Sequence, residues 1–265
     1  MNDKFPLRFF VVTFLWSWLI WMPLFLAGIN VIAIDSTLIA NLTTPMIVLG
    51  AFGPAIAAFF SLRTLKGKGE IGTFVKTFLS IKFGWKVWGA VVLIGIINLV
   101  SWYIPEMFGY ERLPMLLPTV YIFPLYFLIM VFLGGGQEEI GWRGYILPFL
   151  EMKFGLWAGN IILGLVWSFW HLPLWFMSGA SQEYLPFIAF TLGCIGLSFI
   201  FSWVIKVSGN RPLSGLVIHG AFNAFIPLFP TIVMQANVVQ TRFWIQEIII
   251  LVVGSLFMYS MTRKA

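Results

Sequence analysis

The side chains of this sequence that could do chemistry fall inside long apolar stretches, where charged residues are rare. They are two adjacent carboxylates, Glu138 and Glu139, and the two histidines of the chain, His171 and His219. A carboxylate in a low dielectric without a cation beside it suits a general base or acid near neutral pH, and an imidazole transfers protons at the same pH. The four groups therefore indicate proton transfer, such as the activation of a water molecule.

Helical spacing separates the roles of these groups. Glu139 and Arg143 are four residues apart, so on a helix they share a face and are expected to form an ion pair. Glu138 points about 100° away from Glu139 and has no charged partner on that helix, which makes it the candidate base. His219 and Asn223 are also four residues apart, so they present an imidazole and an amide side by side.

Each residue taken alone has a simpler, structural explanation. A buried histidine often links membrane helices by a hydrogen bond, and a buried ion pair is more often structural than catalytic. Trp167, one turn before His171, is expected to be a core residue that could also wall a pocket. The depth of these residues in the membrane favours a site. Glu138 and His171 each lie about 22 Å from the cytoplasmic end of their own expected helices, and His219 and Asn223 are shallower but within reach of the same pocket if the helices tilt.

The composition indicates that the helices carrying these residues lie in a lipid membrane and not in water. Hydrophobic residues make up 60% of the 265 positions and charged residues 10%, whereas a soluble domain has about a quarter charged. The mean hydropathy is +0.95. These values predict an all-α, polytopic membrane protein with one membrane domain over residues 1–265. The net charge of +6 is scattered over loop ends, so the expected partner is the lipid bilayer and not nucleic acid. Cys194 is the single cysteine, which excludes an intrachain disulfide.

Apolar runs predict eight transmembrane helices, since one crossing needs about 20 apolar residues. The first run is expected to be a retained helix and not a signal peptide. The fourth contains three glycines at positions 134 to 136, which predict a kink. Between the second and third runs, residues 66–84 predict an amphipathic helix at the membrane surface. The eight runs cover approximately residues 9–30, 46–64, 86–105, 120–150, 157–178, 186–207, 212–230 and 243–261.

The distribution of lysine and arginine predicts the orientation of the bundle. With eight crossings and both termini in the cytoplasm, all sixteen of these residues except Arg112 and Arg242 fall on the cytoplasmic side. This segregation supports eight helices and an integral protein of the cell membrane. It does not predict the oligomeric state.

The chain carries three motifs in this order: EExxxR at residues 138–143, an aromatic residue four positions before a histidine (Trp167 and His171), and HxxxN at residues 219–223. Together they resemble the motifs of the CAAX protease and bacteriocin-processing family, also called CPBP or Abi. That family includes the type II CAAX prenyl endopeptidases. The resemblance covers residues 120–225, the expected protease core. The family usually has Phe where this chain has Trp167, a change expected to alter the shape of the pocket but not the chemistry.

The resemblance implies an eight-helix fold and hydrolysis of a peptide bond in a membrane-associated protein or peptide. Glu138 and His171 would activate the attacking water, and His219 with Asn223 would stabilise the oxyanion. Glu138, His171 and His219 would also make a nitrogen and oxygen donor set of the kind that holds catalytic Zn²⁺. Metal-bound water and water activated directly by the side chains both stay open.

Two other functions compete with the protease. One is a non-enzymatic bacteriocin-immunity or peptide-binding membrane protein that grips a peptide with the polar cluster. The other is a transporter with a buried proton relay, which is disfavoured because the sequence has no internal repeat of transporter type. The sequence does not identify the substrate or say whether it is prenylated.

Overall fold

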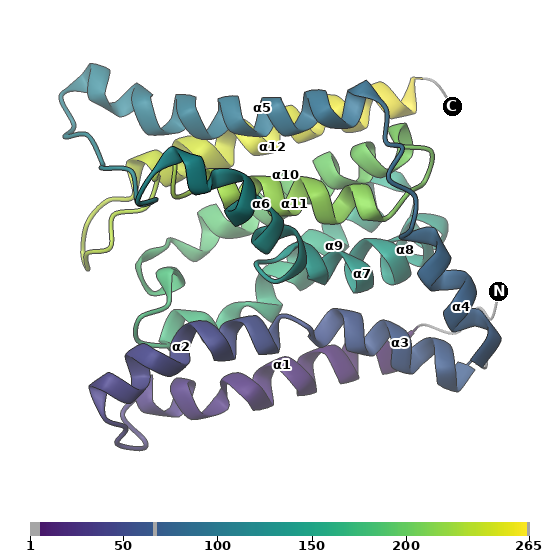
Figure 1. The fold of residues 1–265 in the computed structure, drawn as a ribbon, viewed down its shortest axis with the longest axis horizontal. Coiled ribbons are helices and arrows are strands. Elements are labelled where there is room, and N and C mark those ends of the chain that lie inside the picture. Colours follow the sequence, from purple (N-terminus) through teal and green to yellow (C-terminus); the bar gives the residue numbers. More distant parts are fainter. Residues whose placement is uncertain (1–5, 66–67, 264–265) are drawn as a thin grey trace.

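The computed structural model describes residues 6–65 and 68–263, which form helices and connecting loops without a strand. In Figure 1, α1 and the α2–α3 pair lie along one side of the bundle, α5 and α12 lie along the other, and α9, α10 and α11 lie between them. The predicted all-α membrane class is confirmed. These helices are α1 (Leu7–Gly28), α2 (Ser36–Gly50), α3 (Gly53–Leu65), α5 (Trp85–Tyr103), α9 (Leu156–Trp170), α10 (Phe187–Val207), α11 (Leu213–Phe225) and α12 (Thr241–Thr262).

The predicted count of eight membrane-spanning helices is not reproduced by helix length. Within the described residues, six helical stretches are long and apolar enough to cross a membrane. The runs predicted at 157–178 and 212–230 form α9 and α11, which have only 15 and 13 residues. A proline follows each helix end within a few residues, Pro173 and Pro227, and after α9 the chain continues as a 3-10 helix (Leu172–Phe176). Since α11 is buried along most of its length, its neighbours and not lipid set how long it must be.

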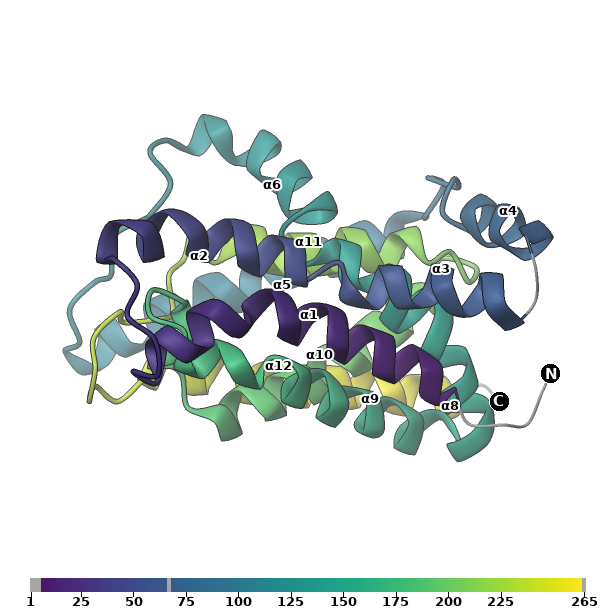
Figure 2. The ribbon, with the colours of Figure 1, turned by 90° about the horizontal axis from the view of Figure 1, so that it is seen from below.

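The fourth predicted run is broken at the three glycines, as expected. After α6 (Phe123–Phe132), the chain turns through Gly135, whose φ of +117° is rarely open to a residue with a side chain. Figure 2 shows α6 standing away from the body of the bundle. The helical form then changes repeatedly, a feature that often marks functional sites. The chain forms in turn a 3-10 helix (Gly136–Glu138), α7 (Glu139–Gly141), a π-helix (Trp142–Ile146) and α8 (Leu147–Phe154).

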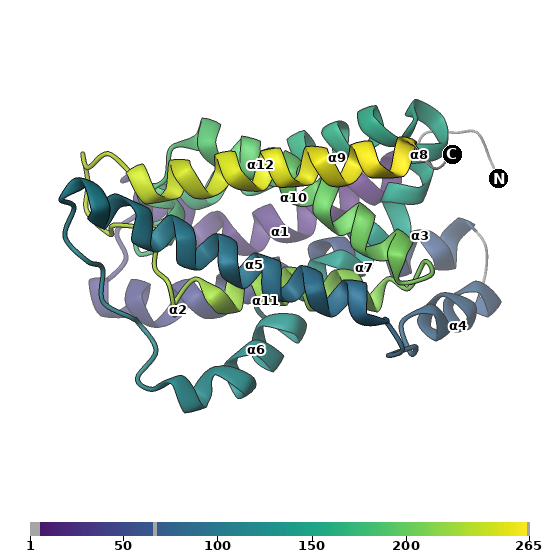
Figure 3. The same cartoon turned by 90° about the horizontal axis from the view of Figure 1, so that it is seen from above.

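The amphipathic segment between the second and third runs is helical but shorter than predicted. It forms α4 (Lys68–Thr77), at the end of the bundle where α1 begins and α12 ends (Figure 3). Phe74 packs edge-on against Phe59 of α3 and Phe78, so its apolar face is turned to the protein. Val75 is exposed. The location of α4 on a membrane surface stays a prediction.

The two arginines predicted to lie outside are found together at the opposite end of the bundle. Arg112 pairs with Glu106 just beyond α5, with 2.7 Å between Nη2 and Oε2. Arg242, at the start of α12, donates from Nε to the Trp102 carbonyl at 3.0 Å. The orientation itself stays a prediction, and three of the expected cytoplasmic cations, Lys4, Lys66 and Lys264, lie outside the described residues.

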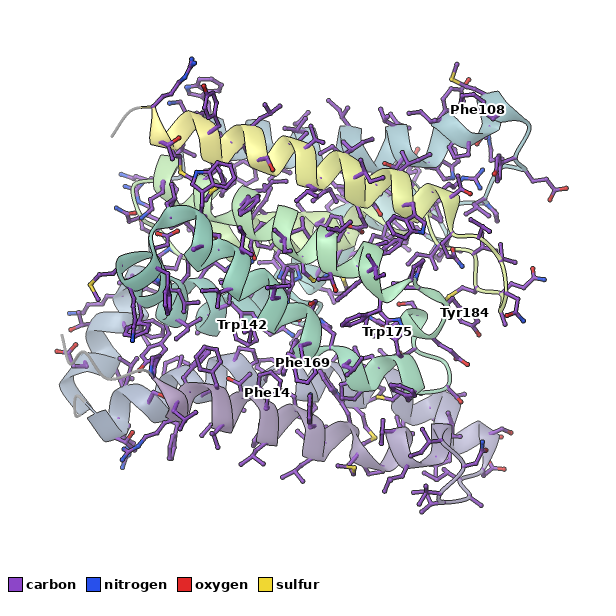
Figure 4. All side chains as sticks on the ribbon, turned by 180° about the vertical axis from the view of Figure 1, so that it is seen from behind. Phe14, Phe108, Trp142, Phe169, Trp175 and Tyr184 are labelled. Carbon is purple, nitrogen blue, oxygen red and sulfur yellow. The ribbon has the colours of Figure 1, made fainter. Side chains whose placement is uncertain are left out.

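A cluster of large aromatic side chains fixes the end of α9. Trp142 and Trp170 are fully buried, and their ring centroids are 5.8 Å apart. From α1, Trp21 packs against Trp170 at 5.1 Å, and Trp18 donates from Nε1 to the Trp170 carbonyl at 3.0 Å. Figure 4 labels Trp142 beside this interface with α1. The cluster holds in place the residue that follows Trp170, which is His171.

Candidate active site

The catalytic candidates line one cavity of about 420 Å³ inside the bundle. Its wall includes Glu138, Trp167, His171, His219 and Asn223, which come from the broken fourth segment, from α9 and its end, and from α11. The structure therefore brings together residues up to 85 positions apart in the sequence, from Glu138 to Asn223. The remaining wall is mostly apolar, as is usual for pockets that bind an organic ligand.

Glu138 is buried and held by a residue of another helix. Its carboxyl Oε2 accepts a hydrogen bond from Nε1 of Trp167 at 2.8 Å, and only 4% of the residue is exposed. Trp167 does line the pocket, as predicted, but it also orients the candidate base. A phenylalanine has no N–H and could not do this.

Glu139 is the centre of a buried network that carries His219. Its Oε1 accepts from Nη1 of Arg143 at 3.0 Å, which confirms the predicted ion pair. The same oxygen lies 2.8 Å from Nδ1 of His219, a contact that links two of the motifs. Arg143 is held further by Ser198 Oγ at 2.8 Å, and its guanidinium lies 4.8 Å from the centre of the Trp167 ring. The network fixes the His219 ring with Nε2 as its free nitrogen.

His219 and Asn223 converge on one point, beside Gly135. A Cβ atom placed on Gly135 would lie 2.7 Å from His219 Nε2 and 2.4 Å from Asn223 Nδ2. Asn223 Nδ2 also donates to the Gly134 carbonyl at 2.6 Å, which leaves the second amide hydrogen for another acceptor. Any side chain at position 135 would fill this point. The two nitrogens are therefore neighbours in the cavity wall, close enough to bind one substrate oxygen together.

His171 presents its free nitrogen in the same way as His219. Its Nδ1 lies 2.9 Å from the Trp167 carbonyl, so Nε2 is the nitrogen left for a ligand. The ring is wedged edge-on between Trp170, with centroids 4.6 Å apart, and Phe190 of α10, at 5.2 Å. Both histidines are thus held through Nδ1 in a fixed orientation.

The predicted zinc donors have the supporting contacts of metal ligands, and their role in binding a metal stays a prediction. Glu138, His171 and His219 each have one polar atom held by a neighbour, as ligating residues commonly do. However, within the described part of the chain no three His, Cys, Asp or Glu side chains come together closely enough to hold a metal ion. No step proposed below passes through a metal.

One cavity residue escaped the sequence analysis altogether. Glu247 of α12 is 3% exposed and lines the same cavity. It is the one carboxylate in the predicted run 243–261, and an ionisable residue inside an apolar run is the signal that should have identified it.

The segment that carries the three motifs is similar to known proteins. Residues 120–225 match the family model described as type II CAAX prenyl endopeptidase Rce1-like. A curated protein named CAAX prenyl protease 2, from Methanococcus maripaludis, is 26% identical over 143 residues, which cover 51% of this chain and 49% of that protein. The chain thus spans about half the length of the curated relative that it matches. The family match has the same bounds as the segment that carries the three motifs.

Proposed function

Since this chain belongs, through residues 120–225, to the CAAX protease family, we propose that it is an intramembrane endopeptidase that cleaves a membrane-associated protein or peptide. One observation supports this most strongly. A candidate base, two oriented imidazoles and an amide line a single cavity among membrane helices. Packing alone does not require four such groups to meet at one place.

The proposed reaction begins with the attack of water on the peptide carbonyl. Glu138 takes a proton from a water molecule that Nε2 of His171 also holds, and the oxygen of this water forms a bond to the carbonyl carbon. The electron pair of the C=O bond moves to the carbonyl oxygen. The electron pair on this oxygen then re-forms the C=O bond while the C–N bond breaks, and Glu138 gives its proton to the departing amine nitrogen. A carboxylic acid and an amine are the products.

The negative oxygen of the intermediate is bound by His219 and Asn223. Because Nδ1 of His219 faces the carboxylate of Glu139, the ring must carry a second proton for Nε2 to donate to the oxyanion. The amide of Asn223 supplies the other donor. Each such donor typically contributes about 2.7–4 kcal/mol to stabilising the transition state.

The proposal is tested in membranes, because the substrate is unknown. Cells that contain the wild-type protein and cells that contain the Glu138→Ala variant are compared by proteomics of new chain termini. Membrane proteins or peptides whose cleavage depends on Glu138 are expected only in the first. Identical sets of termini at equal protein levels would contradict the proposal.

Replacing Trp167 by phenylalanine is expected to lower kcat about tenfold with little change in KM. The variant keeps the ring beside Arg143 but removes the hydrogen bond to Glu138, and hydrogen bonds to charged groups contribute about 1.5–3 kcal/mol. The effect should be partial, because the family usually has Phe at this position. The measurement is steady-state cleavage by protein reconstituted in liposomes. The matched control is Trp102→Phe, which loses an indole hydrogen bond to the Leu113 carbonyl outside the cavity. An unchanged kcat for Trp167→Phe would show that the indole does not position the base.

Removal of metal ions is expected to leave the rate of cleavage unchanged, because the three candidate donors do not converge as arranged. The purified protein is treated with a chelator, its metal content is measured by mass spectrometry, and its activity is compared before and after. Loss of activity that one equivalent of Zn²⁺ restores would instead assign the attacking water to a metal.

A further inference from the structure

Glu247 is a carboxylate in the cavity wall that the proposed reaction does not use. Its Oε2 is buried without a hydrogen-bond partner among the described residues, and the ion pairs described for this chain do not include it. By contrast, Glu139 pairs with Arg143, and Glu151 pairs with Lys206 at 3.1 Å. An ionised carboxylate is costly to bury without a partner. The described part of the chain does not provide this partner, which points to a ligand.

The helix that faces Glu247 leaves room for its carboxyl group. A Cβ atom on Gly193 of α10 would lie only 1.7 Å from Glu247 Oε2, so a larger residue there would displace the carboxyl. Gly193 and its neighbour Cys194 line the cavity together with Glu247. The carboxyl group therefore rests against bare backbone at the cavity wall.

Aromatic side chains flank this carboxyl. Phe243 precedes Glu247 by four residues and lies on the same face of α12, and Phe190 precedes Gly193 on α10. Both phenylalanines line the cavity. An aromatic wall that ends in a carboxylate suits a long aliphatic side chain with a cationic end, because the rings cover the stem and also attract the charge.

The position of Glu247 along the bundle fits a subsite beside the catalytic groups. Glu247 lies six residues into α12, or about 9 Å from the helix start. Ser181 and Gln182 of the 3-10 helix Ser181–Tyr184, and Met234 in the loop that precedes α12, also line the cavity, and Figure 4 labels Tyr184 at this end of the bundle. A peptide that extends from the catalytic groups toward these loops would pass Glu247.

We propose that Glu247 forms a subsite for a lysine or arginine side chain of the peptide substrate. The cation meets the carboxylate from the cavity side, opposite the Gly193 backbone, and its stem lies along Phe190 and Phe243. Charge-assisted contact between the two groups offsets the loss of water by both. The inference rests on the proposed function, because it assigns a residue preference to the substrate of that site.

Binding is measured apart from cleavage in the Glu138→Gln background. The full-length protein in lipid nanodiscs is titrated with dansyl-labelled, leucine-rich peptides that differ only in one lysine or one norleucine, placed at each position in turn. Energy transfer from the tryptophans of the cavity reports binding. At the preferred position we expect the lysine peptide to bind at least about tenfold more tightly than the norleucine peptide. Glu247→Gln should remove this difference and leave the affinity for norleucine unchanged.

Two further variants test whether the lysine preference depends on Glu247 and its position against Gly193. Gly193→Ala moves the flexible end of Glu247 without removing it, and should also weaken the lysine preference. Glu151→Gln alters a paired carboxylate that does not line the cavity, and should keep the preference. Equal binding of both peptides by protein with an intact Glu247, no binding of either, or a preference that survives Glu247→Gln would overturn the inference.

The same reagents separate failure of this inference from failure of the proposed function. Glu138-dependent cleavage without a lysine preference would leave the peptidase intact and exclude the subsite. A lysine preference that depends on Glu247, in a protein that cleaves no peptide, would keep the subsite and remove the enzymatic role.

Discussion

Glu138→Gln is expected to lower the rate of peptide cleavage about 10⁴-fold, the upper end of what a general acid–base group contributes. That loss corresponds to about 5 kcal/mol in the activation barrier. The glutamine keeps the shape of the side chain and can still contact Trp167, but it cannot take a proton from water or return one to the amine. Both halves of the reaction should therefore slow. The measurement is single-turnover cleavage, in liposomes, of a substrate identified by the proteomic comparison of wild-type and Glu138→Ala cells.

The control for this variant is a carboxylate that is hydrogen-bonded like Glu138 but lies outside the cavity. Glu151 binds Lys206, Asn160 and Ser202 away from the cavity, so Glu151→Gln should lower thermal stability and leave the rate unchanged. If Glu138→Gln cleaves as fast as the wild type, Glu138 is not the base. If instead the wild-type protein cleaves nothing, and immunity or peptide binding persists in Glu138→Gln, the non-enzymatic alternative is favoured.

The helices were predictable where the membrane alone dictates them. Long apolar runs such as those that form α1 and α10 must be helical in lipid, because each backbone group needs a partner within its own segment. The shortness of α9 and α11 could not be read from hydropathy, which continues past both helix ends. A proline follows each of those ends closely, and α11 is in addition enclosed by neighbouring helices, which is a tertiary property.

Within the site, contacts along one helix were predictable and contacts between helices were not. The Glu139–Arg143 pair follows from a spacing of four residues. The contacts of Glu139 with His219 and of Trp167 with Glu138 join residues 80 and 29 positions apart, and no periodicity encodes them. Glu247 was missed for a related reason. It is a single carboxylate without a motif, and its importance comes only from the Gly193 backbone and the cavity beside it.

Asn223→Ala is expected to lower kcat about 10²- to 10³-fold while KM changes little, as observed when one oxyanion donor is removed from other hydrolases. The reason is geometric: the Asn223 amide nitrogen and His219 Nε2 are neighbours in the cavity wall next to Gly135, so both can donate to one carbonyl oxygen that gains charge in the cavity. An interaction that strengthens only in the transition state changes kcat and not ground-state binding. The measurement is kcat and KM with the reconstituted protein.

The structural role of Asn223 must be separated from this catalytic one, because its amide also holds the Gly134 carbonyl. Asn160→Ala is the matched control. It removes a buried amide that binds Glu151 and the Leu156 carbonyl outside the cavity, so it should lower stability without a large effect on kcat. Combining Asn223→Ala with His219→Gln should reduce kcat by less than the product of the single effects, since both groups serve one oxygen. A raised KM with unchanged kcat in Asn223→Ala would place this residue in substrate binding instead.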